Sequence, residues 1–453
     1  MISTMRPLSA LFFLTFALSA QSAAPAGCHI ADGEYSGWKA VEMSNPWVKL
    51  EIVPQLGGRL MQVTFAGHDF LFVNSQLKGQ NFGPEASAAQ HRWFNYGGDK
   101  IWPMPEGNED EAHWAGAEGA VLDSGPFHLE ILRQDATCAV RLTGPADPSI
   151  GQQYIRDISI GADSPAISFH AVMKNVSGYP QSWSEQSVSQ YNTADAQNPA
   201  QPNADIWGIT PANPRSVYLD GYHVRTGNAS PRGYGVREGL FSVRAAQAGG
   251  EVWIDSPGEW LAVVDGASQF AMVERFRYQR AADYPGLATV IFYTTGNSRR
   301  GPAAPDADPA RPAIHYMEAE LNSPVVRLDP GETYAMDTQW FPTRMGSDFT
   351  TATYAGVAGK PLAAATAADG IAVSGEFGVF FAGQLELRFY GHGARLGSMN
   401  LQPAAPDSIV NLQKTVQAPP DTTRVSLHLI DAHGLDRGPL GETTVTGPPP
   451  DRN

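Results

Sequence analysis

The sequence predicts an all-β protein in which a sandwich of two large sheets is followed by a small C-terminal β-sandwich. Apolar residues recur at every second position in short runs bounded by glycine and proline, the pattern of strands with one buried face. The 453 residues include 46 glycines and 35 prolines, a composition typical of strands joined by turns. Amphipathic helical patterns stay shorter than about three turns, so we expect no helical layer.

The strands of the large sandwich begin soon after the N-terminus. Val48, Leu50 and Ile52 lie on one face of the first run, and a glycine-rich break at residues 54–58 leads into the next. The same alternation predicts the further strands at residues 61–65, 70–73, 127–131, 154–160, 167–173, 260–264, 270–275, 288–293, 314–321 and 333–341.

The remaining segments divide the chain into domains. The large sandwich is expected over residues 27–350, an Ala/Gly/Thr-rich linker over 351–369, and a small β domain over 370–453. Residues 193–235 form a long stretch with several aromatic rings, which favours a functional loop over disorder. Residues 299–313 are rich in proline, alanine and aspartate and are expected to form an exposed insertion.

The first 26 residues have the pattern of a secretory signal peptide. One basic residue, Arg6, precedes an apolar run from Leu8 to Leu18 and a tail of small residues. The run is too short to cross a membrane. We therefore expect a periplasmic or secreted protein, with no membrane insertion after cleavage of the signal.

The two cysteines, Cys28 and Cys138, are expected to form a disulfide because an exported protein folds in an oxidising compartment. Lipidation of Cys28 is the alternative, although Pro25 stands where a lipoprotein signal carries leucine. Two distant cysteines without a Cys/His spacing motif do not indicate zinc. The net charge of −15, without a basic block, excludes nucleic acid and anionic membranes as expected partners.

A stretch rich in rings and charges, residues 91–105, is the first candidate for a binding site. Two glycines, Gly97 and Gly98, permit a sharp turn there. Aromatic rings beside fixed hydrogen-bonding groups suit a sugar, which presents apolar faces and a rim of hydroxyls. The alternative is a loop packed by its own tryptophans. The candidate binding residues are Arg92, Asn95, Tyr96, Asp99, Lys100 and Trp102.

Three stretches resemble the galactose mutarotase-like (aldose 1-epimerase-like) superfamily, and in particular secreted members without an assigned activity. They are the hairpin at residues 50–60, the Asn-Tyr-Gly-Gly sequence at 95–98, and Glu-Ala-Glu-Leu-Asn-Ser-Pro at 318–324 with its following Leu-Asp-Pro-Gly-Glu-Thr-Tyr at 328–334. The resemblance covers roughly residues 32–344. It implies a β-supersandwich fold and a carbohydrate ligand, either a monosaccharide or the end of a glycan.

The resemblance further implies that Glu318 is a general base that takes a proton from the anomeric hydroxyl. Strand alternation places Glu320 on the same face, roughly 7 Å away, with solvent exposure of both as the alternative. The positions of the two family histidines carry Tyr96 and Gln190 here, and Gln190 is expected to hydrogen-bond the sugar. Possible replacements for the acid are His91, His113 and His170, whereas His315 faces the other way.

Three function classes therefore stay open: an aldose epimerase, a non-catalytic sugar-binding protein, and a structural module. No metal or cofactor is expected, since the chain lacks a phosphate-binding loop. It also lacks the Gly-x-Ser-x-Gly motif of serine hydrolases. The acidic run Glu109-Asp110-Glu111 fits a solvated turn better than a calcium site. A hydrolase that uses Glu318 with Glu320 ranks below these readings, because glycosidase carboxylates normally come from different strands.

Overall fold

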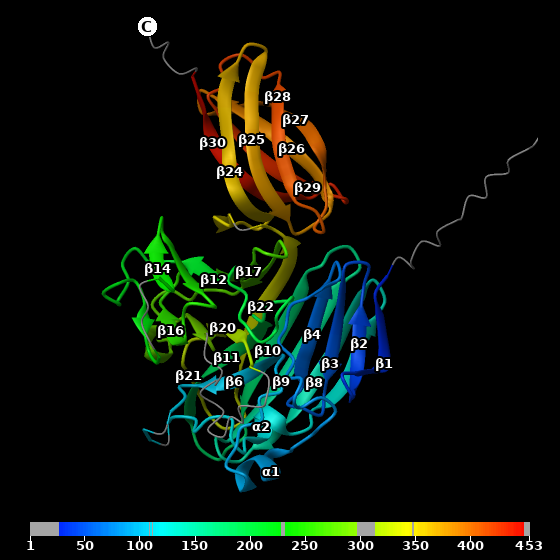
Figure 1. The fold of residues 1–453 in the computed structure, drawn as a ribbon, viewed down its shortest axis with the longest axis vertical. Helices are drawn as coiled ribbons and strands as arrows, with labels where there is room; N and C mark the ends of the chain where they lie inside the picture. The colour runs from blue at the N-terminus through cyan, green and yellow to red at the C-terminus, as the bar shows by residue number, and fades with distance from the viewer. Residues whose placement is uncertain are drawn as a thin grey trace, which may run out of the picture.

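A computed structural model describes residues 27–107, 109–110, 112–227, 232–296, 313–346 and 348–447. The predicted signal peptide, Glu111 and nearly all of the predicted insertion at 299–313 lie outside these ranges. The described chain forms three sheets, two in a large N-terminal domain and one in a smaller C-terminal domain (Figure 1). The all-β prediction is confirmed.

The first sheet carries twelve described strands and reaches from the N-terminus to the candidate catalytic strand. Its neighbours are antiparallel, so strands distant in sequence lie side by side. In spatial order it contains β1 (His29–Tyr35), β2 (Trp38–Ser44), β3 (Val48–Val53), β4 (Arg59–Phe65), β6 (Asp99–Met104), β11 (Gln181–Asn192), β20 (Tyr316–Asn322), β19 (Val290–Thr294), β16 (Gly250–Ile254) and β13 (His223–Val224), with β5 (His68–Asp69) beside β4 and β21 (Val326–Leu328) beside β11.

The second sheet has ten described strands and packs against the first. In spatial order these are β14 (Tyr234–Arg237), β15 (Leu240–Arg244), β12 (Ile206–Pro211), β17 (Trp260–Asp265), β18 (Phe270–Arg275), β22 (Thr333–Arg344), β10 (Ile167–Asn175), β9 (Gln152–Gly161), β8 (Thr137–Asp147) and β7 (His128–Gln134). Short helices α1 (Pro84–Ala89) and α2 (Val121–Ser124) and the 3-10 turn η1 (Pro285–Leu287) lie in the connections.

The main core lies between these two sheets. It combines Leu50 and Val63 of the first sheet with Ile158 and Phe169 of the second, and all four side chains are buried. Burial of such side chains is the principal favourable term in folding. Because strand residues alternate between faces, the first sheet also has a second face, which points away from this core.

The C-terminal domain forms one eight-stranded sheet around a core of its own. Its strands are, in spatial order, β27 (Ala394–Ala404), β26 (Gly383–Gly391), β29 (Arg424–Asp431), β30 (Asp436–Thr446), β24 (Gly356–Ala367), β25 (Gly370–Val379) and β28 (Val410–Val416), with β23 (Thr351–Ala352) beside β24. The predicted linker at 351–369 is therefore wrong, since most of it is the paired strand β24. Its small side chains pack in the sandwich, with Ala358 and Ala364 buried.

The two domains share a hydrophobic contact. The Phe341 ring of β22 stacks on Phe380 with 4.6 Å between centroids, and the same cluster includes Trp260 and Phe349. The Thr343 hydroxyl also donates a hydrogen bond to the Val379 carbonyl at 3.0 Å. This contact fixes the small domain at the end of the large one (Figure 1).

Most strands predicted for the large domain are confirmed, but two expectations are wrong. Residues 70–73 make only isolated bridges, at Leu71 and Val73. Residues 193–235, expected as one long loop, contain β12, β13 and the start of β14. The pattern also missed β11 because most of its buried residues are polar.

The disulfide predicted between Cys28 and Cys138 is present and joins the start of the described chain to β8. The thiol of Cys28 is thus not free for lipidation in this structure. None of the described helices has the length and apolar character needed to span a membrane.

Replacing Cys28 with serine is expected to lower the free energy of unfolding by about 2–4 kcal/mol. The disulfide spans 110 residues, and its loss enlarges the conformational entropy of the unfolded chain. Urea denaturation under oxidising conditions measures the change. Reductant should destabilise the wild type and leave Cys28→Ser unchanged. Equal midpoints for the two oxidised proteins would show that the bond contributes nothing.

Candidate functional site

A cavity of about 520 Å³ opens on the face of the first sheet that points away from the main core. We call it the glutamate cavity, because five glutamates line it. Its size falls within the range of small-molecule sites, and carboxylates, guanidinium groups and aromatic rings share its wall. The lining residues are His91, Arg92, Trp93, Trp102, Met104, Glu106, Ala115, Gly116, Ala117, Glu118, Gln186, Arg225, Thr226, Glu251, Trp253, Tyr293, Tyr316, Glu318 and Glu320.

Strand register brings the floor of the cavity together. Residues directly opposite one another in antiparallel strands project to the same face. One row across the sheet runs through Gln190, Glu318, Tyr293 and Glu251. The next row places Val188, Glu320, Ile291 and Trp253 side by side. Five strands, β6, β11, β20, β19 and β16, therefore build one floor.

Two buried donors, Lys100 and Gln190, contact the Glu318 carboxylate. The Nζ atom of Lys100 lies 3.4 Å from Glu318 Oε1, and Gln190 donates a hydrogen bond to the same oxygen at 2.6 Å. Lys100 is itself buried, with Nζ 4.3 Å from the centroid of the Trp102 ring. Burial lowers the pKa of Lys100, while the negative charge of Glu318 opposes that shift. The pair thus fixes the position of the Glu318 carboxylate in the wall.

Three other glutamates of the cavity have raised pKa values. Burial, followed by the charge of Glu318, raises the pKa of Glu320 well above its usual range, and Gln186 donates to Glu320 Oε2 at 2.6 Å. Burial also raises the pKa of Glu251, whose carboxylate accepts a hydrogen bond from the Trp253 indole. Glu106 shifts in the same direction, although its exposure to solvent limits the effect. Such desolvated carboxyl groups in one cavity are typical of functional sites.

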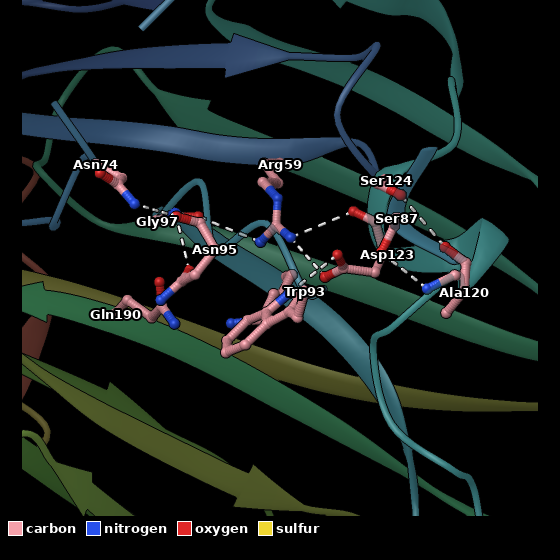
Figure 2. Close-up of polar contacts among 12 residues, drawn as sticks. Arg59, Asn74, Ser87, Trp93, Asn95, Gly97, Ala120, Asp123, Ser124 and Gln190 are labelled. Atoms are coloured by element: carbon pink, nitrogen blue, oxygen red, sulfur yellow. Dashed lines mark hydrogen bonds and ion pairs between the residues drawn. The ribbon is translucent and has the colours of Figure 1, made fainter. Parts of the chain in front are cut away.

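A buried ion pair supports the side of the cavity that carries Trp93. Arg59 contacts Asp123 at 2.5 Å, and both side chains are almost completely buried. Arg59 also donates to the Gly97 carbonyl at 3.2 Å, while the Trp93 indole donates to Asp123 Oδ2 at 3.2 Å. Figure 2 shows the guanidinium between the glycine turn and Asp123, with the Trp93 ring alongside. The pair therefore connects β4, the turn and α2.

The Gly97–Gly98 turn can only be made by glycines. Both residues have positive φ values, 93° and 73°, and a Cβ atom at Gly97 would collide with the Phe72 carbonyl. The backbone bonds Gly98 N to Phe72 O and Gln190 N to Gly98 O hold the turn against β11. The predicted sharp bend is present, and it positions Gln190 behind Glu318.

Four of the nine predicted site residues line the cavity: Arg92, Trp102, Glu318 and Glu320. Lys100 and Gln190 contact Glu318 but do not themselves line the cavity. Asn95 does not line the cavity either, but its side chain forms a hydrogen bond with Tyr316, which does. Its own Oδ1 accepts from the Gly97 amide.

Tyr96 and Asp99 are corrections to the predicted binding set. Tyr96 is fully buried against Trp38, and its hydroxyl accepts a hydrogen bond from the Phe82 amide at 2.7 Å. Asp99 faces the interior between the sheets, where it pairs with Arg156 of β9. Strand alternation explains the difference, because Asp99 and Lys100 must point to opposite faces of β6.

The candidate replacement histidines all have carboxylate partners. His91 alone among the described histidines lines the cavity, and it is exposed and paired with Glu118 at 3.2 Å. His113 and His170 instead pair with Asp110 and Asp337. His315 is buried beside the Gly296 and Ala200 carbonyls, away from the cavity face.

Sequence reasoning missed several residues of the wall, chiefly Glu106, Gln186, Arg225, Glu251, Trp253 and Tyr293. Alternation of Glu251 and Trp253 with apolar residues is a strand pattern and could have predicted β16. The strand has only five residues, however, and this is too short for the alternation to be recognised with certainty. Within the described ranges, no group of three or more His, Cys, Asp or Glu side chains is arranged to hold a metal ion.

Comparisons with known proteins give likeness of structure alone. No protein-family model and no curated protein matches the chain. A TPR-domain containing protein from Parabacteroides distasonis matches with a TM-score of 0.47 at 14% identity over 68% of this chain and 47% of that one. The chain thus spans about half the length of that protein.

The alignment with this chain covers two further solved structures almost completely. A protein from Synechocystis has a TM-score of 0.47 at 10% identity, over 69% of this chain and 99% of that one. A galactose mutarotase-like protein from Clostridium acetobutylicum has a TM-score of 0.43 at 10% identity, over 71% of this chain and 100% of that one. Galactose mutarotase-like structures are thus among those that this fold resembles. At these identities and TM-scores, no activity is transferred to this chain.

Replacing Asp123 with asparagine is expected to cost about 3–5 kcal/mol of folding free energy, because it leaves the buried Arg59 charge without its partner. The matched control is Asp329→Asn, which breaks the exposed pair with Arg327 and should cost less than about 1 kcal/mol. Chemical denaturation of both variants gives the comparison. A similar small loss in both would contradict the supporting role of the buried pair.

Proposed function

We propose that this protein binds a carbohydrate in the glutamate cavity and catalyses exchange of its anomers, with Glu318 as the base. The observation that carries the proposal is the placement of Glu318 and Glu320 on one cavity floor beside several aromatic rings. Flat rings pack against the apolar face of a sugar, and carboxylates accept hydrogen bonds from its hydroxyls. The cavity volume suits a monosaccharide or the end of a glycan.

The proposed reaction needs a base within reach of the anomeric hydroxyl and an acid within reach of the ring oxygen. Glu318 takes the proton of the anomeric hydroxyl while the bond between the anomeric carbon and the ring oxygen breaks. Glu320 supplies a proton to the ring oxygen, since burial and the charge of Glu318 raise its pKa and so favour the protonated carboxyl group that an acid needs. Rotation of the open-chain aldehyde followed by the reverse proton transfers closes the ring with the opposite configuration.

Non-catalytic sugar binding is the second candidate, and one observation favours it. Glu318 Oε1 already accepts from Gln190 and faces Lys100, so both donors compete with a substrate proton for that oxygen. A cavity that retains rings and hydrogen-bonding groups can bind a sugar without turnover. Binding and anomer exchange are therefore measured separately.

Replacing Trp253 with alanine is expected to weaken sugar binding about tenfold, because the half-buried indole supplies an aromatic wall of the cavity. Calorimetry with a panel of monosaccharides measures the affinity. Tyr179→Ala removes an exposed ring outside the lining and serves as the control. Unchanged affinity in a folded Trp253→Ala protein would place the sugar elsewhere.

Fresh α-glucose or α-galactose should equilibrate faster in the presence of the protein, as followed by proton NMR. The isosteric change Glu318→Gln is expected to reduce this acceleration by about 10²–10⁴-fold, because glutamine cannot accept the anomeric proton. Glu34→Gln, an exposed charge change on β1, is the control. If a sugar binds but its anomers exchange no faster than in buffer, the protein is a non-catalytic sugar-binding protein.

A further inference from the structure

We propose that the glutamate cavity selects a sugar that carries a free amino group, such as a hexosamine, over the corresponding neutral sugar. This inference rests on the proposed carbohydrate binding and adds a charge to the ligand. It follows from how the carboxylates and cations of the cavity are paired.

The cavity wall carries more negative than positive groups. Five glutamates line it, against two guanidinium groups and His91. Two of the glutamates have ionic partners, since Glu318 pairs with Lys100 and Glu118 with His91. Within the described chain, Glu106, Glu251 and Glu320 make no ion pair.

The arginines of the wall do not offset these three carboxylates fully. Arg225 attracts Glu251 electrostatically, but its nearest ionic partner is Glu109 at 3.6 Å, outside the lining. Its guanidinium also lies 5.4 Å from the Trp253 ring centroid. Arg92 lies over Phe94 at 5.0 Å. The floor therefore presents carboxylates without a full set of cations, and Glu320 there is only 7% exposed.

Aromatic rings beside these carboxylates complete a site for an ammonium group. Tyr293 pairs with both Glu251 and Glu318 in the strand register, and the Trp253 indole donates a hydrogen bond to Glu251. The negative face of an aromatic ring attracts a cation, and carboxylates accept the three N–H donors of an ammonium. This chain already uses the arrangement once, where Lys100 lies between the Trp102 ring and Glu318.

A neutral sugar fits this charge pattern less well. Its hydroxyls hydrogen-bond these carboxyl groups but bring no positive charge to Glu251 and Glu318, whose charges raise the pKa of Glu320. An ammonium attracts the Glu251 and Glu318 carboxylates and donates a hydrogen bond to a Glu320 oxygen, and the partly desolvated setting strengthens the attraction. A bare metal ion is a poorer occupant, because no metal-holding group of three occurs in the described chain.

The test is calorimetric titration of the full mature chain with D-glucosamine, D-glucose and N-acetyl-D-glucosamine at pH 7. The first two differ only in an amino group in place of a hydroxyl, and the third carries a neutral amide. We expect glucosamine to bind at least about tenfold more tightly than either neutral sugar, the range of a charged hydrogen bond. Added salt should weaken glucosamine binding more than glucose binding.

Glu251→Gln removes one unpaired charge and keeps the shape of the side chain. It should reduce the preference for glucosamine over glucose about tenfold, whereas Glu34→Gln makes the same charge change on exposed β1 and should leave the preference intact. Equal affinities for glucosamine and glucose would overturn the inference while sugar binding stands. Failure of all three sugars to bind would overturn both the inference and the proposed function.

Discussion

The buried ion pair between Arg59 and Asp123 is the constraint on which the site wall depends. Removing two charges from water is costly, and the cost is offset only when every partner is in place. Here the guanidinium reaches the Gly97 carbonyl, and the carboxylate also accepts from Trp93. One interaction thereby joins β4, the glycine turn, α2 and an aromatic wall of the cavity (Figure 2).

The polar strand β11 shows how a buried strand serves two environments. On one face, Gln186 and Gln190 hold Glu320 and Glu318 of the cavity floor. On the other face, Ser189 donates to Asp99 and Tyr191 donates to Glu274 between the sheets. Burial raises the pKa of Glu274 to about 8, so this second network includes a carboxyl group that is largely neutral at neutral pH. Both faces need hydrogen-bonding side chains, because buried polar groups require partners.

The proposed chemistry follows from unequal environments on one strand. Glu318 faces a lysine, whereas Glu320 faces an amide and has a raised pKa. The proposal therefore assigns the base to one of these settings and the acid to the other. The same neighbouring carboxylates that add to the raised pKa of Glu320 also favour the positively charged ligand that we propose. The proposed catalysis and the proposed ligand choice therefore depend on one charge pattern.

The sequence by itself determined the all-β class, most strands of the large sandwich, the disulfide and the shared face of Glu318 and Glu320. These depend on local alternation, on composition and on two cysteines, all of which are readable without a fold. Only the tertiary structure decided that Tyr96 and Asp99 lie in the interior, that residues 356–367 form a strand, and that Glu251 and Trp253 join the cavity. Those outcomes depend on which strands become neighbours, and β16 reaches β20 only through β19, which pairs with both. Long-range pairing leaves no local signal, so the cavity emerges only when the sheet is assembled.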